Sequence, residues 1–141
     1  MYGSETWAMK VNDVCRLERT ENNMVRGMCG VKLSDRHSSD ELRERLRIAS
    51  VMKVVRAGSL GWFGHLERMS VNDPVSACRH LEVPGERGKG RPGKTWQEGI
   101  DGYMRVLGLH RGLVFDRSRW KESCWGNRLT RVHMENGRYT K

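Results

Sequence analysis

Apolar residues recur at intervals of three and four along most of this 141-residue chain, which is the period of helices that bury one face. The longest periodic segment covers residues 12–28, with Asn12 or Asp13 as its predicted N-cap and Gly30 as a left-handed residue after its end. Its predicted inner face consists of Val14, Leu17, Met24, Val25 and Met28. The period therefore predicts an all-α fold, a small irregular bundle of about five helices.

Two more helices are predicted in the first half of the chain, and both begin with a serine cap. Ser38 and Glu41 have the spacing of a capping box at the start of a short surface helix, whose predicted buried side consists of Leu42, Leu46 and Ile48. Ser50 caps the next segment, the predicted core helix, which would form the main pair with residues 12–28. The predicted inner face of the core helix consists of Val51, Val54, Val55, Trp62, Phe63, Leu66 and Met69.

Three glycines, Gly58, Gly61 and Gly64, lie inside the predicted core helix. Each costs about 0.5 to 1 kcal/mol relative to alanine in a helix interior. Close packing against another element, or a break in the helix, must therefore explain them.

Core packing is favoured over stacking on nucleobases for the tryptophans that lie on predicted apolar faces: Trp62, Trp96 and Trp120.

A stretch rich in Gly and Pro, VPGERGKGRPGK at residues 83–94, follows a possible short helical turn at 73–81. No apolar residue lies between Val83 and Trp96, so this stretch predicts an extended, solvated loop. Its basic residues are Arg87, Lys89, Arg91 and Lys94. Contact with phosphates is the favoured interpretation, and two alternatives remain: a minor-groove reader similar to an AT-hook, and a plain linker.

The C-terminal part predicts two helices. Thr95 and Glu98 form a second capping box, and Gly108 ends the helix that they begin. Its predicted inner face consists of Trp96, Ile100, Met104 and Leu107. A last helix at residues 110–124 would bury Leu113, Val114 and Trp120 and would expose Asp116, Arg117, Arg119 and Lys121.

The sequence divides the chain into four predicted parts: helices at 1–70, the basic loop at 71–95, helices at 96–126, and a disordered basic tail at 127–141.

Positive charge is concentrated in the second part of the chain. The formal net charge is +9, and residues 50–141 carry 17 basic and 9 acidic side chains against 9 and 8 in residues 1–49. Such asymmetry favours attraction to a polyanion. We expect RNA or DNA as the partner, bound mainly through its phosphates. The predicted nucleic-acid-binding residues are Arg87, Lys89, Arg91 and Lys94 in the loop, and Arg117, Arg119 and Lys121 as a second patch.

No window reaches the roughly 18 consecutive apolar residues of a membrane helix, so we expect a soluble chain with no membrane partner. Residues 1–10 lack the basic start and apolar block of a secretory signal, which predicts an intracellular protein, nuclear or cytoplasmic. In that reducing environment Cys15, Cys29, Cys78 and Cys124 are expected to be free thiols.

Catalytic and cofactor sites are not predicted. Polymerase chemistry needs paired aspartates on a strand turn to hold two divalent metals, and no Tyr-x-Asp-Asp-like element is found in the sequence. A zinc site can be drawn from Cys78 and His80 with His65 or Cys124, but no Cys-x-x-Cys pair supports it. We therefore expect no enzyme activity, no metal and no cofactor.

Five motifs in a fixed order resemble one known family. They are YGSETW at Tyr2–Trp7, MCGVKLSDR at Met28–Arg36, GWFGHLERM at Gly61–Met69, GKGRPGKTW at Gly88–Trp96 and FDRSRW at Phe115–Trp120. Together they resemble the segment that follows the polymerase core in the reverse transcriptases of LINE-like non-LTR retrotransposons. The positions that match the family's signatures are Trp62, Phe63, Gly64 and His65; Gly90, Arg91, Pro92, Lys94 and Trp96; and Asp116, Arg117 and Trp120.

The resemblance implies an accessory role. In that family the first motif ends a helix of the thumb region, and the helices after it form a C-terminal domain that helps to hold template RNA and target DNA. This chain then corresponds to a nucleic-acid-binding C-terminal fragment of a reverse transcriptase that lacks the polymerase and endonuclease active sites.

Two other functions remain open. The chain can be a helical protein-interaction module that docks on the polymerase core of the parent enzyme through Val14, Leu17 and Met24. It can also be a decayed remnant with no role, which the helix glycines permit, as does the presence of Ser59 and Gly61 where the family tends to have Arg.

Overall fold

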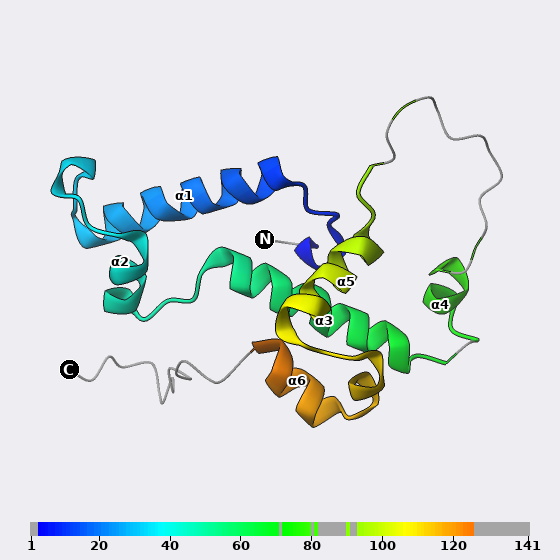
Figure 1. Ribbon diagram of the computed structural model, residues 1–141. Coiled ribbons are helices and arrows are strands. Elements are labelled where there is room, and N and C mark those ends of the chain that lie inside the picture. Colours follow the sequence, from blue (N-terminus) through cyan, green and yellow to red (C-terminus); the bar gives the residue numbers. More distant parts are fainter. Residues whose placement is uncertain (1–2, 71, 80, 82–89, 91–92, 126–141) are drawn as a thin grey trace.

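The computed structural model describes residues 3–70, 72–79, 81, 90 and 93–125, and within them it contains helices and no strand (Figure 1). The predicted all-α fold is confirmed. The α-helices are α1 (Val11–Cys29), α2 (Ser39–Leu46), α3 (Val51–Arg68), α4 (Pro74–Arg79), α5 (Trp96–Leu107) and α6 (Arg117–Trp125). Short 3₁₀ helices are η1 (Ser4–Thr6), η2 (Leu33–Asp35) and η3 (Arg111–Phe115). The predicted tail at 127–141 lies outside the described residues.

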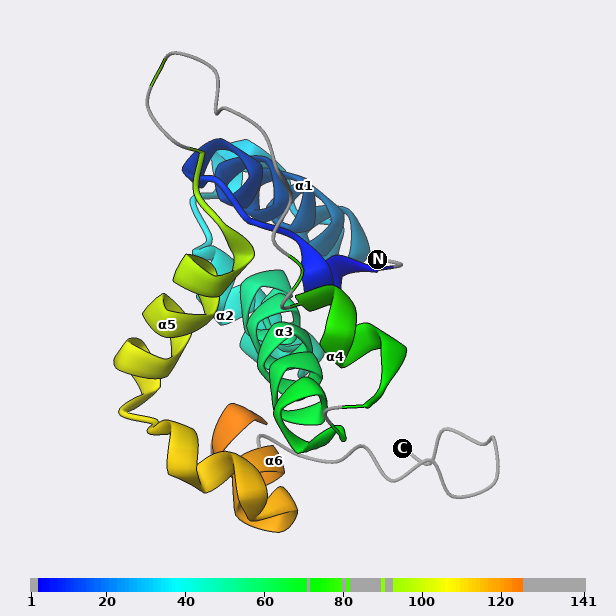
Figure 2. The ribbon, with the colours of Figure 1, turned by 90° about the vertical axis from the view of Figure 1, so that its right-hand side faces the viewer.

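Helix α3 lies in the middle of the molecule, with α1, α5 and α6 around it (Figure 2). The main core joins α3 to α5, η3 and α6. Its buried members are Leu60, Phe63, Ile100, Met104, Val114, Trp120 and Cys124. No residue of α1, which is described throughout, belongs to this cluster, so the prediction that residues 12–28 and the core helix form the main pair is wrong.

Helix α1 is covered only in part. Val25 is its buried residue, whereas Met24 and Met28, predicted to face inward, are 63% and 65% exposed. The reason is the position of α1 in the fold: its Glu21 carboxylate accepts a hydrogen bond from Val51 N (2.6 Å), the first residue of α3, so α1 meets the beginning of α3 and not its length. Val54 on α3 is likewise 43% exposed, and Ile48, which follows the end of α2, is 37% exposed, both against prediction.

The predicted N-cap residues are confirmed at three helices, and of the two predicted capping boxes the reciprocal pair of bonds forms at Thr95 and Glu98, whereas at Ser38 the Glu41 carboxylate faces His37. Ser38 Oγ accepts from Glu41 N (3.1 Å), and Ser50 Oγ accepts from Lys53 N (3.3 Å). At α5, Thr95 Oγ1 accepts from Glu98 N (3.3 Å), and the Glu98 carboxylate accepts from Thr95 N (3.0 Å). These side chains satisfy backbone donors that a helix start leaves unpaired.

The start of α1 differs from the prediction. Lys10 is the N-cap residue and the helix begins at Val11, before both predicted caps. The Asp13 carboxylate accepts a hydrogen bond from Lys10 N (3.2 Å), so it closes the first turn from the third helical position. At the other end Gly30 has a φ of 65°, the predicted left-handed conformation.

The predicted helix at 110–124 is two elements. Asp116 is extended (φ −86°, ψ 92°) and separates η3 from α6. Its carboxylate accepts from Arg119 N (3.0 Å) and its carbonyl accepts from Trp120 N (2.8 Å), so it caps a new helix in place of continuing the first one. The break redirects the chain so that both Val114 and Trp120 enter the core.

Candidate nucleic-acid interface

The basic loop meets the folded part of the molecule at Lys94. Arg87, Lys89 and Arg91 lie outside the described residues, and the Lys94 side chain is exposed. Two residues later, Trp96 Nε1 donates a hydrogen bond to the backbone carbonyl of Glu5 (2.8 Å). This bond fixes the beginning of α5 against η1, so the described end of the loop is attached at a defined place.

The second predicted patch is divided by the geometry of α6. Arg117, Arg119 and Lys121 are all exposed, as predicted. Because successive helical residues are rotated by about 100°, Arg117 and Lys121 share one side of α6, whereas Arg119 lies about 200° away from Arg117. Arg119 also forms an ion pair with Asp116 (3.4 Å). The fold therefore brings Arg117 and Lys121 together and turns Arg119 elsewhere.

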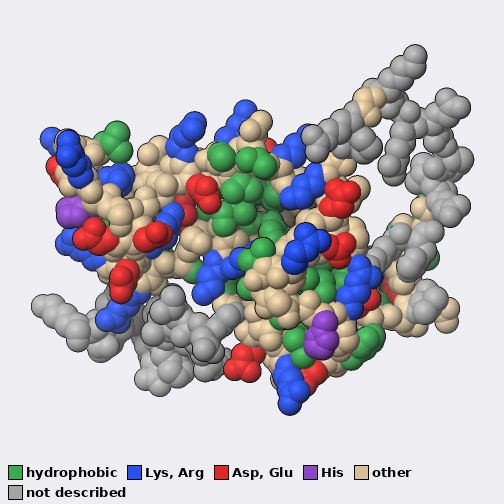
Figure 3. All heavy atoms as spheres, in the orientation of Figure 1, with side chains coloured by type: hydrophobic (Ala, Val, Ile, Leu, Met, Phe, Trp, Pro, Cys, Tyr) green, Lys and Arg blue, Asp and Glu red, His purple; other side chains and the backbone are tan. Residues whose placement is uncertain are grey.

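Arg105 on α5 is a further exposed cation that the sequence analysis did not select. The sequence could have indicated the exposure of Arg105, because this residue directly follows Met104, which lies on the predicted inner face of the helix, and is not itself on that face. Nearby Arg111 is also exposed, but its guanidinium forms an ion pair with Asp101 (3.2 Å). In Figure 3 Lys and Arg side chains spread over this face with Asp and Glu side chains between them, so the surface is a set of separate cations and not one continuous patch.

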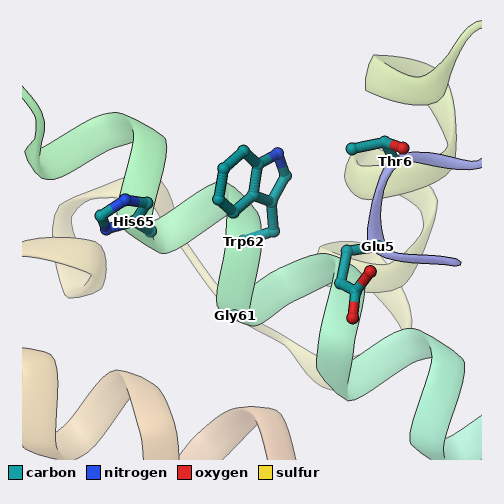
Figure 4. Close-up of a pocket in the computed structure, with 5 residues that line it drawn as sticks. All are labelled: Glu5, Thr6, Gly61, Trp62 and His65. Carbon is teal, nitrogen blue, oxygen red and sulfur yellow. The ribbon is translucent and has the colours of Figure 1, made fainter. Parts of the chain in front are cut away.

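An open pocket lies between η1 and α3, and it is lined by Glu5, Thr6, Gly61, Trp62 and His65 (Figure 4). Its volume is about 520 Å³. Trp62, predicted to lie in the core, is half-buried and forms part of the pocket wall, whereas the next residue, Phe63, is fully buried. Since adjacent helical residues point about 100° apart, only one of the two rings could enter the core.

The other two tryptophans are structural, as predicted. Trp120 is buried, and its Nε1 donates to the Leu60 carbonyl (3.0 Å). Both Trp96 and Trp120 contact the Phe63 ring, with centroid distances of 6.3 and 6.1 Å. Their N–H groups and ring faces are therefore used inside the protein.

The cysteines differ in exposure. Cys15 and Cys78 are exposed, and Cys124 is buried in the core. Burial raises the pKa of the Cys124 thiol to about 11, opposed in part by the positive charge of Arg68. Among the described residues, His, Cys, Asp and Glu side chains form no group of three or more that could hold a metal ion.

Within the described part of the chain, no helix has the length and apolar character needed to span a bilayer.

Comparisons with known proteins found no match to this chain, whether to a protein-family model, a curated protein or a solved structure.

Proposed function

We propose that this chain binds nucleic acid through the phosphate backbone, as an accessory C-terminal region of a retroelement reverse transcriptase without the polymerase and endonuclease active sites. The observation that most supports this proposal concerns exposed cations between residues 94 and 125. Several of them form no ion pair with any described carboxylate. They are Lys94, Arg105, Arg117 and Lys121. By contrast, Arg111 and Arg119 are paired with aspartates.

The mechanism is electrostatic. Lys and Arg side chains that reach phosphates release condensed counterions, so the affinity falls as salt rises. Phosphate contacts position a protein and carry no base sequence information, so this binding is largely independent of sequence. On the face shown in Figure 3, Lys and Arg side chains are interspersed with Asp and Glu side chains, so contacts with phosphates would be made at separate points.

A pair of double variants tests the surface cations. Arg117→Gln with Lys121→Gln removes two unpaired cations and should flatten the slope of log affinity against log salt by about two on duplex DNA, since each phosphate contact contributes about 0.9. Arg111→Gln with Arg119→Gln removes the same formal charge from cations already paired with aspartates. We expect a smaller change from this control, and equal changes in slope would show that only net charge matters.

The loop is tested separately. Replacing Arg87, Lys89, Arg91 and Lys94 together should weaken binding to RNA and duplex DNA alike and flatten the duplex slope by about three to four. Loss confined to A·T-rich duplex would favour the minor-groove reader. No change in affinity or slope would make this stretch a linker.

A second candidate function is supported by α1. Met24 and Met28 are 63% and 65% exposed, which leaves apolar side chains available to a protein partner such as a polymerase core. Met24 belongs to the predicted docking face, whose other residues, Val14 and Leu17, are partly covered; Met28 lies one turn after Met24. A salt titration separates the two functions, because binding to a polyanion weakens steeply with salt whereas apolar docking does not. Binding to neither partner would indicate a decayed remnant.

A further inference from the structure

We propose that the pocket between η1 and α3 receives one unpaired base of a single-stranded nucleic acid, with Trp62 as the stacking surface. This inference rests on the proposed nucleic-acid binding and adds a preference for single strands, which phosphate contacts alone do not supply. The pocket is lined by Glu5, Thr6, Gly61, Trp62 and His65.

Trp62 is placed differently from the two structural tryptophans. The N–H groups of Trp96 and Trp120 donate to backbone carbonyls, at 2.8 and 3.0 Å. Among the described residues the Trp62 indole has no hydrogen-bond acceptor, and its ring contact is with His65, at a centroid distance of 5.3 Å. The two rings are inclined by 40°, so they do not lie face to face. The Trp62 side chain is half-buried and lines the open pocket, so part of its indole surface faces a space that a second planar ring could enter.

Glycine makes the space beside the indole. Gly61 is exposed, and a Cβ placed on it would meet no atom within 4 Å. In Figure 4 Trp62 stands between His65 and Thr6, with its nitrogen toward Thr6. The pocket thus offers an aromatic surface with an open side, bordered by a hydroxyl and the Glu5 carboxylate, groups that hydrogen-bond base edges.

The described end of the basic loop is joined to one wall of the pocket. The backbone carbonyl of Glu5 accepts the hydrogen bond from Trp96, while the Glu5 side chain contributes a carboxylate to the pocket lining, and Lys94 lies two residues before Trp96. Because consecutive Cα atoms are about 3.8 Å apart, the Lys94 backbone lies within about 8 Å of the Trp96 backbone. Lys94, an exposed cation, is therefore linked through Trp96 to η1, which forms one wall of the pocket.

The test compares single-stranded RNA with duplex DNA of equal length and with a strand in which abasic sites replace the bases. Trp62→Leu should weaken binding to the RNA by about 5- to 150-fold, the range for loss of one base stacked on an aromatic side chain. Its affinity for the duplex and for the abasic strand should stay unchanged, as should the salt slope.

Gly61→Leu provides an independent variant that fills the pocket and leaves Trp62 in place. Leucine favours helix, and the position is open, so the fold should be retained. Gly27→Leu on α1, also an exposed position with no atom near its Cβ, is the matched control and should bind as the original protein does. Circular dichroism and thermal melting check each fold.

Photocrosslinking of the original protein is a test that does not depend on whether a variant folds. RNA containing 5-iodouridine should crosslink to Trp62 or His65 on irradiation. Crosslinks found only elsewhere, or full RNA affinity in folded Gly61→Leu and Trp62→Leu proteins, would overturn the pocket proposal while salt-dependent binding preserved the proposed function. If the original protein binds neither RNA nor duplex at low salt, both proposals fail.

Discussion

At the level of single residues, Gly64 permits a close approach between α3 and Trp120. The Trp120 indole donates to the Leu60 carbonyl, one turn before Gly64 on α3. A Cβ on Gly64 would overlap that indole. The absence of a side chain thus lets a tryptophan reach a helix carbonyl that a longer residue would cover.

Gly64→Ala should destabilise the protein by about 1 to 3 kcal/mol, because the indole must shift and its buried hydrogen bond weakens. Gly61→Ala on the same helix should stabilise it by about 0.5 to 1 kcal/mol, since its added methyl meets open space and only the helix propensity changes. Urea unfolding measures both. Equal effects of the two substitutions would contradict the close contact at Gly64.

Cys124 should behave as an unreactive thiol near neutral pH, because burial raises its pKa to about 11. Exposed Cys15 and Cys78 should react first with a thiol reagent, and Cys124 only on unfolding. The folded-state pKa exceeds the ordinary value of 9.0, so the unfolded state loses the proton first. The contribution to stability is complete below about pH 9 and is lost as pH rises toward 11.

Urea unfolding at several pH values measures this loss. Cys124→Ala should reduce the fall in stability between pH 9 and 11, and Cys78→Ala, which changes an exposed thiol, is the control. An identical pH dependence in all three proteins would show that Cys124 does not titrate differently in the folded state.

At the level of elements, Glu21 holds three helices together. Its carboxylate accepts from Val51 N (2.6 Å) at the start of α3 and from Arg43 on α2 (3.0 Å). Arg43 also donates to Asn22 on α1 (2.7 Å). The Glu21 and Arg43 side chains are each 13% exposed, so the pair is shielded from water more than an ordinary surface ion pair.

Glu21→Gln should cost about 1 to 3 kcal/mol, because it weakens the bonds of a largely buried guanidinium and of a helix N-terminus. Glu18→Gln, on an exposed position of the same helix, should change stability by less than about 0.5 kcal/mol. Thermal and urea unfolding compare the two. A negligible effect at Glu21 would mean that packing alone positions α1.

At the level of the whole molecule, burial is unevenly distributed. The main core consists of residues from α3, α5, η3 and α6, whereas α1 contributes one buried side chain, Val25, in nineteen residues. Figure 1 shows α1 and α2 at one end of the molecule, away from α6. Elements with few buried apolar contacts open locally at lower free energy than the core.

Hydrogen exchange should therefore be faster in α1 and α2 than in α3 and α5. Glu21→Gln should accelerate exchange in α1 further and leave α5 unchanged, because its bonds link α1 with α2 and the start of α3. Exchange measured by mass spectrometry or NMR tests this order. Protection of α1 equal to that of α3 would show that the molecule opens as one unit.

Local chemistry was readable from the sequence. The helical period, the Ser38, Ser50 and Thr95 caps, and Gly108 as a left-handed stop (φ 64°) are decided by residues within one turn of each other, and the structure confirms them. The exposure of Arg117 and Lys121 also followed from helical spacing.

Only the tertiary structure decided which apolar face each helix buries and how fully. Met28 lies on a predicted inner face but is exposed. Trp62 lines a pocket, whereas its neighbour Phe63 is fully buried in the core. The sequence could not predict that the Trp120 indole packs against Gly64, because this contact joins residues that are 56 positions apart. Periodicity states that a helix has an apolar side; which part of that side is covered depends on where the other helices cross it.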